Sequence, residues 1–320
     1  MLTTMSNLPQ EVPKNLLRFT SLCTHSGSFH ADDVFSVAVL RSLQPEARVV
    51  RSRDPKVWAQ CNILVDVGSE FDPENGRFDH HQADFEAERE GVRYASSGLV
   101  WKYFGMAYLE ATLGKTFDAS TRKAVWLALD RKLVQPLDLA DTGQGQPDWG
   151  YSTLPSLVFA FNATWLDECD SEGTQRFLWA VHSVQTLLSQ VANSAAAEVL
   201  AERHVLEAEE LSGGKVLVLP QPGLPWREAV LAHKPDALFV VNARSSADWG
   251  VHVVPKQAGS FAARKNLPAA WGGKNSQELS EITGVQDAVF CHKGLFIACA
   301  KSRQSAIRMA EMALEGGQAQ

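Results

Sequence analysis

The 320-residue sequence lacks the features that mark membrane and secreted proteins. No apolar run approaches the roughly 20 residues that span a bilayer. The N-terminus has no basic segment followed by an apolar one, which is the pattern of a secretory signal. We therefore expect no membrane partner, and we expect residues 1–17 to form a loose leader.

Cysteine is scarce, and the five cysteines show no C-x-x-C pair. They are Cys23, Cys61, Cys169, Cys291 and Cys299. Most lie in apolar runs, a placement that argues against a zinc framework or a disulfide scaffold. We expect reduced, buried thiols in a cytoplasmic protein.

Two common catalytic motifs are also missing. Residues 24–27, Thr-His-Ser-Gly, lack the Gly-Lys-Ser/Thr ending of a phosphate-binding P-loop. No G-x-S-x-G sequence is present to supply a serine nucleophile. Phosphate binding by a P-loop and serine hydrolase chemistry therefore both lose their main support.

What the sequence does contain is clustered histidine and aspartate, most clearly in Asp79-His80-His81. Imidazole and carboxylate together suit Mn²⁺, Fe²⁺, Co²⁺ or Zn²⁺, whereas an all-oxygen set favours Mg²⁺ or Ca²⁺. A solvated loop would explain this triplet on its own. The interpretation as a metal site depends on the other clusters.

A second cluster places His25, His30 and Asp32 just before the apolar run 34–40. The apolar residues recur at helical spacing, which predicts a strand, a ligand loop and then a helix. Carboxylates in the first turn of a helix are favoured by its dipole. Asp32 as a simple helix cap and His30 as a surface residue are an alternative, but a cap does not require two histidines.

Two further carboxylates complete the set. The apolar run 61–67 predicts a buried parallel strand that presents Asp66 at its tip. Asp138 and Asp141 lie one helical turn apart before Gly143. A turn and a helix end explain each of these in isolation. The combined ligands exceed the needs of one four-coordinate ion and predict a paired-metal site: His25, His30, Asp32, Asp66, Asp79, His80, His81 and Asp141.

The net charge of −7 is unevenly distributed. Residues 1–214 carry 18 Lys+Arg against 29 Asp+Glu, or −11, and residues 215–320 carry 12 against 8, or +4. The basic part offers cations for phosphates and, in Trp249, Phe261 and Trp271, rings for base stacking. A solvated basic face is equally consistent with this charge.

The order of apolar and helical segments predicts two α/β parts. Short apolar runs alternate with helical stretches between residues 19 and 141, as in βαβ units, so we expect a doubly wound, mostly parallel sheet. A long helical region over 172–211 follows, and then a smaller, mixed α/β part. The predicted limits are a catalytic domain at 18–170, a helical connector at 171–213 and a substrate-binding domain at 214–320.

In their order, these motifs resemble the melanocyte-proliferating-gene (Myg) family, a branch of the DHH phosphoesterases. The resemblance rests on His-x4-His-x-Asp, Asp-Val-Gly, Phe-Asp-His-His-Gln and Asp-x-x-Asp-x-Gly, and on segments 249–255, 260–268 and 290–297. It covers about residues 22 to 301. Departures from the family pattern occur at Thr142, at 272–274 and at 298–299.

The resemblance implies a metal-dependent phosphodiester hydrolase, foremost a 3′–5′ exonuclease on RNA or short oligonucleotides. We expect two Mn²⁺ ions, with Mg²⁺, Co²⁺ or Zn²⁺ also suitable, bridged by Asp66 and activating a water. Asp79, His80 and His81 are the expected catalytic residues. The expected substrate-binding residues are Arg264, Lys265, His252 and His292. A catalytically silent phosphate- or nucleotide-binding protein and a small-nucleotide phosphoesterase are the alternatives.

Overall fold

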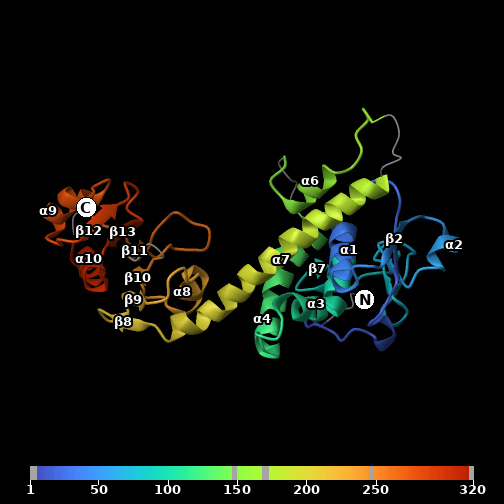
Figure 1. Ribbon diagram of the computed structural model, residues 1–320, viewed down its shortest axis with the longest axis horizontal. Helices are drawn as coiled ribbons and strands as arrows, with labels where there is room; N and C mark the ends of the chain where they lie inside the picture. Colours follow the sequence, from blue (N-terminus) through green and yellow to red (C-terminus); the bar gives the residue numbers. More distant parts are fainter. Residues whose placement is uncertain (1–5, 146–149, 168–172, 245–247, 317–320) are drawn as a thin grey trace. The chain divides into compact units, whose positions relative to one another are not determined.

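The chain folds into two compact units, residues 1–196 and 197–320, each with its own sheet and core (Figure 1). The computed structural model describes residues 6–145, 150–167, 173–244 and 248–316. Cys169 lies outside these ranges, and the other four cysteines are buried and unpaired, as predicted. None of the described helices is both long and apolar enough to cross a membrane.

The first unit contains a five-stranded sheet and the helices that pack on it. Its main strands are β1 (Ser21–Thr24), β2 (Arg48–Arg51), β3 (Ile63–Val65), β4 (Phe71–Asp72) and β5 (Arg77–Phe78), with a separate hairpin of β6 (Glu88–Arg89) and β7 (Val92–Arg93). Its helices are α1 (Ala31–Leu43), α2 (Pro55–Trp58), α3 (Ser96–Leu113), α4 (Ala119–Leu129), α5 (Gln135–Asp141), α6 (Leu154–Phe159) and α7 (Gly173–Leu206), which continues past residue 196.

The strand order of this sheet is β2-β1-β3-β5-β4. The first four strands are parallel, and β4 runs antiparallel at the edge. All residues of β1 and β3 are buried, which explains why both read as continuous apolar runs. The predicted mostly parallel sheet of an α/β unit is confirmed.

Aromatic side chains hold the helices of the first unit together. Phe35 of α1 packs against Trp101 of α3, and Trp101 stacks on Trp126 of α4 with ring centroids 6.2 Å apart. Gln185 of α7 donates to the Ser42 hydroxyl, 3.2 Å away, so α7 lies along α1 (Figure 1). These contacts fix α1, whose first turn carries two of the acidic residues discussed below.

The described part of the N-terminal segment is not a loose leader. The Gln10 amide donates to the Lys102 carbonyl at 2.8 Å, and Leu16 is buried. The ammonium group of Lys102 in turn donates to the carbonyls of Ser6 and Leu8. The prediction is wrong because a small number of apolar and backbone contacts anchor a segment whose sequence is not periodic.

The second unit contains a six-stranded mixed sheet of order β12-β13-β11-β10-β9-β8. Its elements are β8 (Glu209–Leu211), β9 (Val216–Leu219), α8 (Arg227–His233), β10 (Phe239–Ala243), β11 (Trp249–Val253), α9 (Ser276–Thr283), β12 (Ala288–Cys291), β13 (Ile297–Ala300) and α10 (Arg303–Glu315). Only β9 and β10 pair in parallel; the other neighbours are antiparallel.

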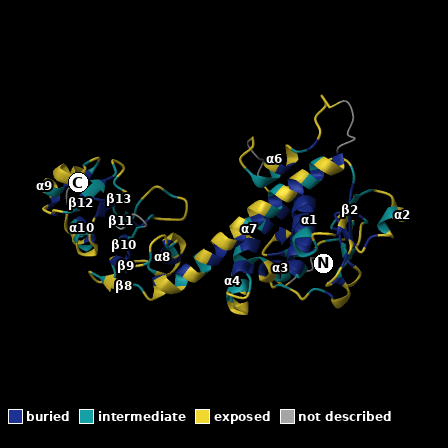
Figure 2. Cartoon of the chain, viewed as in Figure 1, coloured by how far each residue is buried: buried dark blue, intermediate teal, exposed yellow. Residues whose placement is uncertain are grey.

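Alternation along β9 divides the core of the second unit into two layers. Val218 faces a cluster that includes Met309 of α10, whereas Leu217 faces a cluster that includes Val230 of α8. This is the period-2 pattern of a strand buried on both faces. Figure 2 shows the buried strands between more exposed helices.

Candidate metal centre

The carboxyl ends of three parallel strands bring together side chains that are far apart in the sequence. His25 follows β1, Asp66 follows β3, and Asp79, His80 and His81 follow β5. Because β1, β3 and β5 are parallel neighbours, these residues meet at one edge of the sheet.

Two helices contribute the remaining groups. Asp32 and Asp33 lie in the first turn of α1, where the Asp33 carboxylate accepts from the His30 amide at 3.0 Å. This bond fixes the loop that carries His30. Asp141 is the last residue of α5. The predicted ligands therefore do converge, although they come from five separate segments.

Asp66 lies at the centre of the cluster. Its Oδ2 is 3.3 Å from His25 Nε2, and its Oδ1 is 3.3 Å from His80 Nε2. Ser96 donates to the same Oδ1 at 3.1 Å. The Asp66 backbone has φ 55°, a left-handed conformation that is unfavourable for most non-glycine residues and that recurs at functional sites.

Among the residues that the structure describes, three groups of side chains offer ligand atoms close enough together to hold an ion, and Asp66 belongs to two of them. The groups are Asp66-His80-His81, His25-Asp33-Asp66 and His30-Asp32-Asp141. His80 Nε2 connects the first to the third, because it lies 3.1 Å from an Asp141 oxygen. Mixed imidazole and carboxylate donors suit a divalent transition metal.

Several of these donors are buried without a hydrogen-bond partner among the described residues. They are both carboxylate oxygens of Asp32 and Oδ2 of Asp33. An isolated buried carboxylate is costly unless a cation or a hydrogen bond compensates it. These oxygens belong to two of the three groups, and cations bound there would compensate them, so the residues present fit a bound metal.

The charges in the cluster shift its protonation strongly. Burial and the charge of Asp66 raise the pKa of Asp33 to about 7. Burial would lower the pKa of His80, but hydrogen bonds to Asp141 and Asp66 outweigh it and raise the pKa to about 10. Burial also raises the pKa of Asp32, with the charges of Asp66 and Asp141 adding to it. Protons thus balance the crowded carboxylates, and a bound cation would displace them.

Asp79 occupies a different position from the one predicted for a ligand. It accepts from the backbone amides of Ser69 and His80 at 2.6 and 2.8 Å, and it lies 2.8 Å from His81 Nδ1. It is in none of the three groups formed by the described residues. These contacts orient His81 and the turn around it, and a direct metal or catalytic role of Asp79 stays a prediction.

The prediction from the sequence missed Asp33 as a candidate ligand. Asp33 Oδ2 lies 3.4 Å from His25 Nε2, and Asp33 is fully buried. The available signal was its position next to Asp32 in the first turn of the predicted helix. In the structure, Asp33 Oδ1 accepts from the His30 amide at the start of α1, whereas Oδ2 faces His25.

The four predicted substrate-binding residues lie in the second unit and are not equivalent. Arg264 Nη1 donates to three backbone carbonyls, including that of Ala237 at 2.9 Å, and Lys265 donates to the Leu314 carbonyl at 2.6 Å. His292 Nδ1 accepts from the Gly294 amide. These three residues have structural contacts, and their substrate roles stay predictions.

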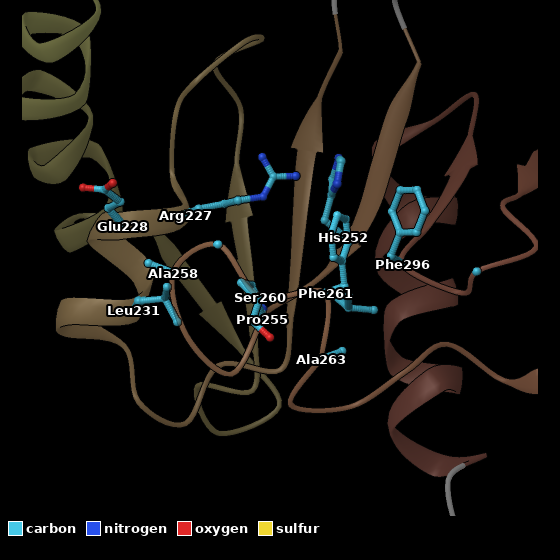
Figure 3. Close-up of a pocket in the computed structure, with 13 residues that line it drawn as sticks. Arg227, Glu228, Leu231, His252, Pro255, Ala258, Ser260, Phe261, Ala263 and Phe296 are labelled. Carbon is cyan, nitrogen blue, oxygen red and sulfur yellow. The ribbon is translucent and has the colours of Figure 1, made fainter. Parts of the chain in front are cut away.

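His252 instead lines a hollow of about 700 Å³ in the second unit. Figure 3 shows Arg227 of α8 and Phe296 on either side of it. Gly250 makes room for the ring, because a Cβ there would lie 2.9 Å from His252 Nε2. Phe261, fully exposed, also borders the hollow. The hollow thus combines a cation, an imidazole and aromatic faces.

The first unit is an α/β unit with a candidate metal centre: a mostly parallel sheet whose strand ends gather buried carboxylates and imidazoles. A family model named MYG1_exonuc, described as "Uncharacterised protein family (UPF0160)", matches residues 21–314. The chain belongs to this family. Its curated relatives include proteins named exonuclease, which makes the chain a hydrolase.

The similarity to these relatives extends over nearly the whole chain. MYG1 exonuclease of Rattus norvegicus is 31% identical, and the match covers 98% of this chain and 90% of that protein. A MYG1 protein of Saccharomyces cerevisiae is 30% identical, with 96% and 99% covered. Human MYG1 exonuclease is 29% identical, with 96% and 89% covered.

Solved structures give only a distant likeness. An exopolyphosphatase-related protein from Bacteroides fragilis is 11% identical with a TM-score of 0.23, covering 94% of each chain. The exonuclease RecJ bound to manganese is 13% identical with a TM-score of 0.23, covering 94% of this chain and 91% of that one. At these scores neither likeness bears on fold or function.

Proposed function

We propose that this protein is a metal-dependent phosphodiester hydrolase, a 3′–5′ exonuclease that acts on RNA or short oligonucleotides with two divalent ions, Mn²⁺ foremost. The naming of its relatives as exonucleases supports a nucleic-acid substrate. The buried, unpaired cysteines support a cytoplasmic location.

The observation that carries this proposal is the sharing of Asp66 by two ligand groups. One carboxylate with a different imidazole at each oxygen is suited to bridging two ions. When bound there, the ions supply Lewis acids that acidify water and neutralise charge on phosphoryl oxygens. The oxygens of Asp32 favour the same conclusion, because they accept no hydrogen bond from the described residues.

The protein's own groups have distinct tasks in this reaction. His25, Asp33 and Asp66 would hold one ion, and Asp66, His80 and Asp141 would hold the other. His81 is the proposed proton donor to the leaving oxygen, because its side chain is 58% exposed and Asp79 holds its Nδ1. Its hydrogen bond to Asp79 also raises the pKa of His81, which keeps a proton available near neutral pH.

The hollow of the second unit offers groups for holding the rest of the substrate. Arg227 makes no hydrogen bond or ion pair with the described residues, and its guanidinium is suited to a phosphate. Phe261 and Phe296 present exposed faces on which a base can stack. We assign His252 to this binding function, as the sequence predicted.

The deciding experiment is hydrolysis of 5′-labelled RNA, DNA and dinucleotides with Mn²⁺, Mg²⁺ or EDTA. The proposal expects a stepwise ladder that shortens RNA from its 3′ end with Mn²⁺ and disappears with EDTA. Asp66→Asn should abolish it, whereas Glu110→Gln, a change of an exposed carboxylate on α3, should not. Products that show shortening from the 5′ end would overturn the proposed 3′–5′ direction of degradation.

The same panel separates the alternatives. Turnover of dinucleotides alone would identify a small-nucleotide phosphoesterase. Tight metal-dependent binding of every substrate without turnover would identify a catalytically silent binding protein. Activity that survives both EDTA and Asp66→Asn would rule out the metal centre as the reactive site.

A further inference from the structure

A second hollow, of about 390 Å³, adjoins the metal centre in the first unit. His30, Asp32 and Asp141 form one wall, and these residues are also one of the three ligand groups. The opposite side is apolar and aromatic, with Phe159 of α6 and, just before α6, Tyr151. Whatever fills this hollow is therefore held directly against the metal ligands.

The two aromatic side chains are unusually exposed. Tyr151 is 75% exposed and Phe159 is 55% exposed. Large rings of this kind are normally buried or partly covered in a folded unit. Here both rings line the hollow without belonging to the core, which indicates a ligand with a flat face of its own.

The position of the aromatic wall is fixed by specific contacts. The Asn162 side chain accepts from the Phe29 amide and donates to the Phe29 carbonyl, both at 2.9 Å. Asn162 is buried, and Phe29 immediately precedes the ligand His30. The segment that carries α6 is thus fastened to the loop of a metal ligand, so the wall and the metal centre keep a constant separation.

The lining restricts the chemistry of the ligand. Leu137 and Ala140 of α5 add further apolar surface, and neither lysine nor arginine lines the hollow among the described residues. An anion would find no counter-charge on the aromatic side. An uncharged ring, attached to a group that binds at the metal centre, satisfies both walls.

From these observations we infer that the hollow beside α6 binds the base of the terminal nucleotide, by stacking on Tyr151 and Phe159, while that nucleotide's phosphate lies at the metal centre. This assignment rests on the proposed function and adds to it the residues that position the reacting end. Stacking tolerates any base, because every base has a π-face. The site would then act on successive terminal nucleotides without sequence preference.

The test is binding of AMP and of ribose 5-phosphate to the full chain with Mn²⁺, measured by calorimetry. AMP carries the base, and ribose 5-phosphate lacks it. One stacked base is expected to make AMP bind about 5- to 150-fold more tightly. Tyr151→Leu with Phe159→Leu should bring this ratio close to one and leave ribose 5-phosphate binding unchanged, because leucine keeps the apolar volume but not the ring.

Two matched variants make the result specific. Trp165→Leu changes a ring that is 91% exposed but does not line the hollow, and it should keep the wild-type ratio. Phe261→Leu with Phe296→Leu removes the rings of the other hollow and tests whether the base of AMP lies there instead. Loss of the ratio in this last variant alone would place the base in the second unit and overturn the assignment.

Further outcomes would overturn it as well. Equal binding of AMP and ribose 5-phosphate by the wild-type protein would do so, as would no detectable AMP binding at millimolar concentration. A wild-type ratio that persists in the Tyr151 and Phe159 double variant would have the same effect. Since binding needs no turnover, a base preference without hydrolysis of any substrate would count against the proposed function and leave the stacking site standing.

Discussion

At the scale of single residues, the decisive feature is that Asp66 serves two ligand groups, whereas Asp141 serves one. We predict that the wild-type protein binds two Mn²⁺ per chain, that Asp141→Asn binds one tightly, and that Asp66→Asn binds neither tightly. Loss of the bridging charge should weaken binding by more than the 10- to 100-fold that an outer partner costs. Equilibrium dialysis with metal analysis measures both number and affinity.

Ser96→Ala is the matched control for this series. Ser96 donates to Asp66 from outside the ligand groups, so its loss should weaken binding by about 10- to 100-fold and leave the number of ions at two. Equal stoichiometry in Asp66→Asn and Asp141→Asn would contradict the bridging role.

His252 gives a second prediction at this scale. Burial, with the charges of Arg227 and Arg244 adding to it, lowers the pKa of His252 to about 4. The folded state keeps the ring neutral, while the unfolded chain takes up a proton below about pH 6.5. Stability is therefore present above pH 6.5 and is lost as the pH falls toward 4, by about 2 kcal/mol between pH 7 and pH 5.

The measurement compares denaturant unfolding of the wild-type protein and His252→Gln at these two pH values. Glutamine cannot take up the proton, so the variant should lose about 2 kcal/mol less on acidification. Identical pH dependence in the two proteins would show that His252 is not held neutral in the fold.

The residue types and their order were enough to predict most of the metal cluster. Histidine and aspartate at the ends of apolar runs point to one sheet edge whenever the strands are parallel. The sequence could not show that the Asp79 carboxylate accepts hydrogen bonds from nearby backbone amides, including that of Ser69. Those bonds depend on the backbone path of residues 66–69. Nor could it separate Arg264 from Arg227, since both are merely basic until their neighbours are known.

At the scale of elements, α5 shows how one helix divides two aspartates between structure and site. Asp141 faces the ligand groups, whereas Asp138 accepts from the hydroxyl of Ser97, the Gly98 amide and Arg89 Nη1. Position 98 requires glycine, because a Cβ there would lie 2.1 Å from an oxygen of the Asp138 carboxylate. The spacing of the two carboxylates gave no indication of this division.

Arg89 joins the hairpin of β6 and β7 to these helices. It is fully buried, 2.7 Å from Asp138 and 3.0 Å from Asp130. We predict that Arg89→Ala lowers the free energy of unfolding by about 3–5 kcal/mol, because it leaves buried carboxylates without their counter-charge. Urea unfolding at neutral pH measures the loss.

Arg131→Ala is the control, since Arg131 pairs with Glu90 at 3.1 Å but is 62% exposed. That change should lower the free energy of unfolding by no more than about 1 kcal/mol. Similar losses for the two arginines would show that burial does not set the strength of the Arg89 contacts.

Long helices were predicted closely, and elements defined by pairing were not. The sequence predicts a helix over residues 97–113, and α3 spans Ser96–Leu113. The helical region expected to reach residue 211 ends at Leu206, because Glu209–Leu211 pairs with β9 as an edge strand. Tertiary pairing overrides the helical preference of the two glutamates there. Helices α8 and α9, of 7 and 8 residues, are shorter than the roughly 11 residues over which apolar spacing identifies a helix, so the sequence did not predict them.

At the scale of the whole molecule, the two units differ in charge and in the kind of site they contain. Residues 1–196, with 17 Lys+Arg against 24 Asp+Glu or −7, contain the ligand groups, and residues 197–320, with 13 against 13 or 0, contain the hollow with Arg227. Composition gives the difference in charge but not the kinds of site. It could not predict where the units divide, because residues 196 and 197 lie within the continuous helix α7. The predicted limits at 170 and 213 stay predictions of domain boundaries.

The division into units predicts that metal acts on one of them only. All three ligand groups belong to residues 1–196, so Mn²⁺ should stabilise that unit by about 2.7 kcal/mol at 100 times its dissociation constant. In scanning calorimetry, exchange of EDTA for Mn²⁺ should raise one unfolding transition by about 5–10 °C and leave a second transition in place. Asp66→Asn should abolish the shift, and acidification to pH 5 should lower the second transition in the wild-type protein more than in His252→Gln. A single transition that moves as a whole with Mn²⁺ would show that the two units unfold together.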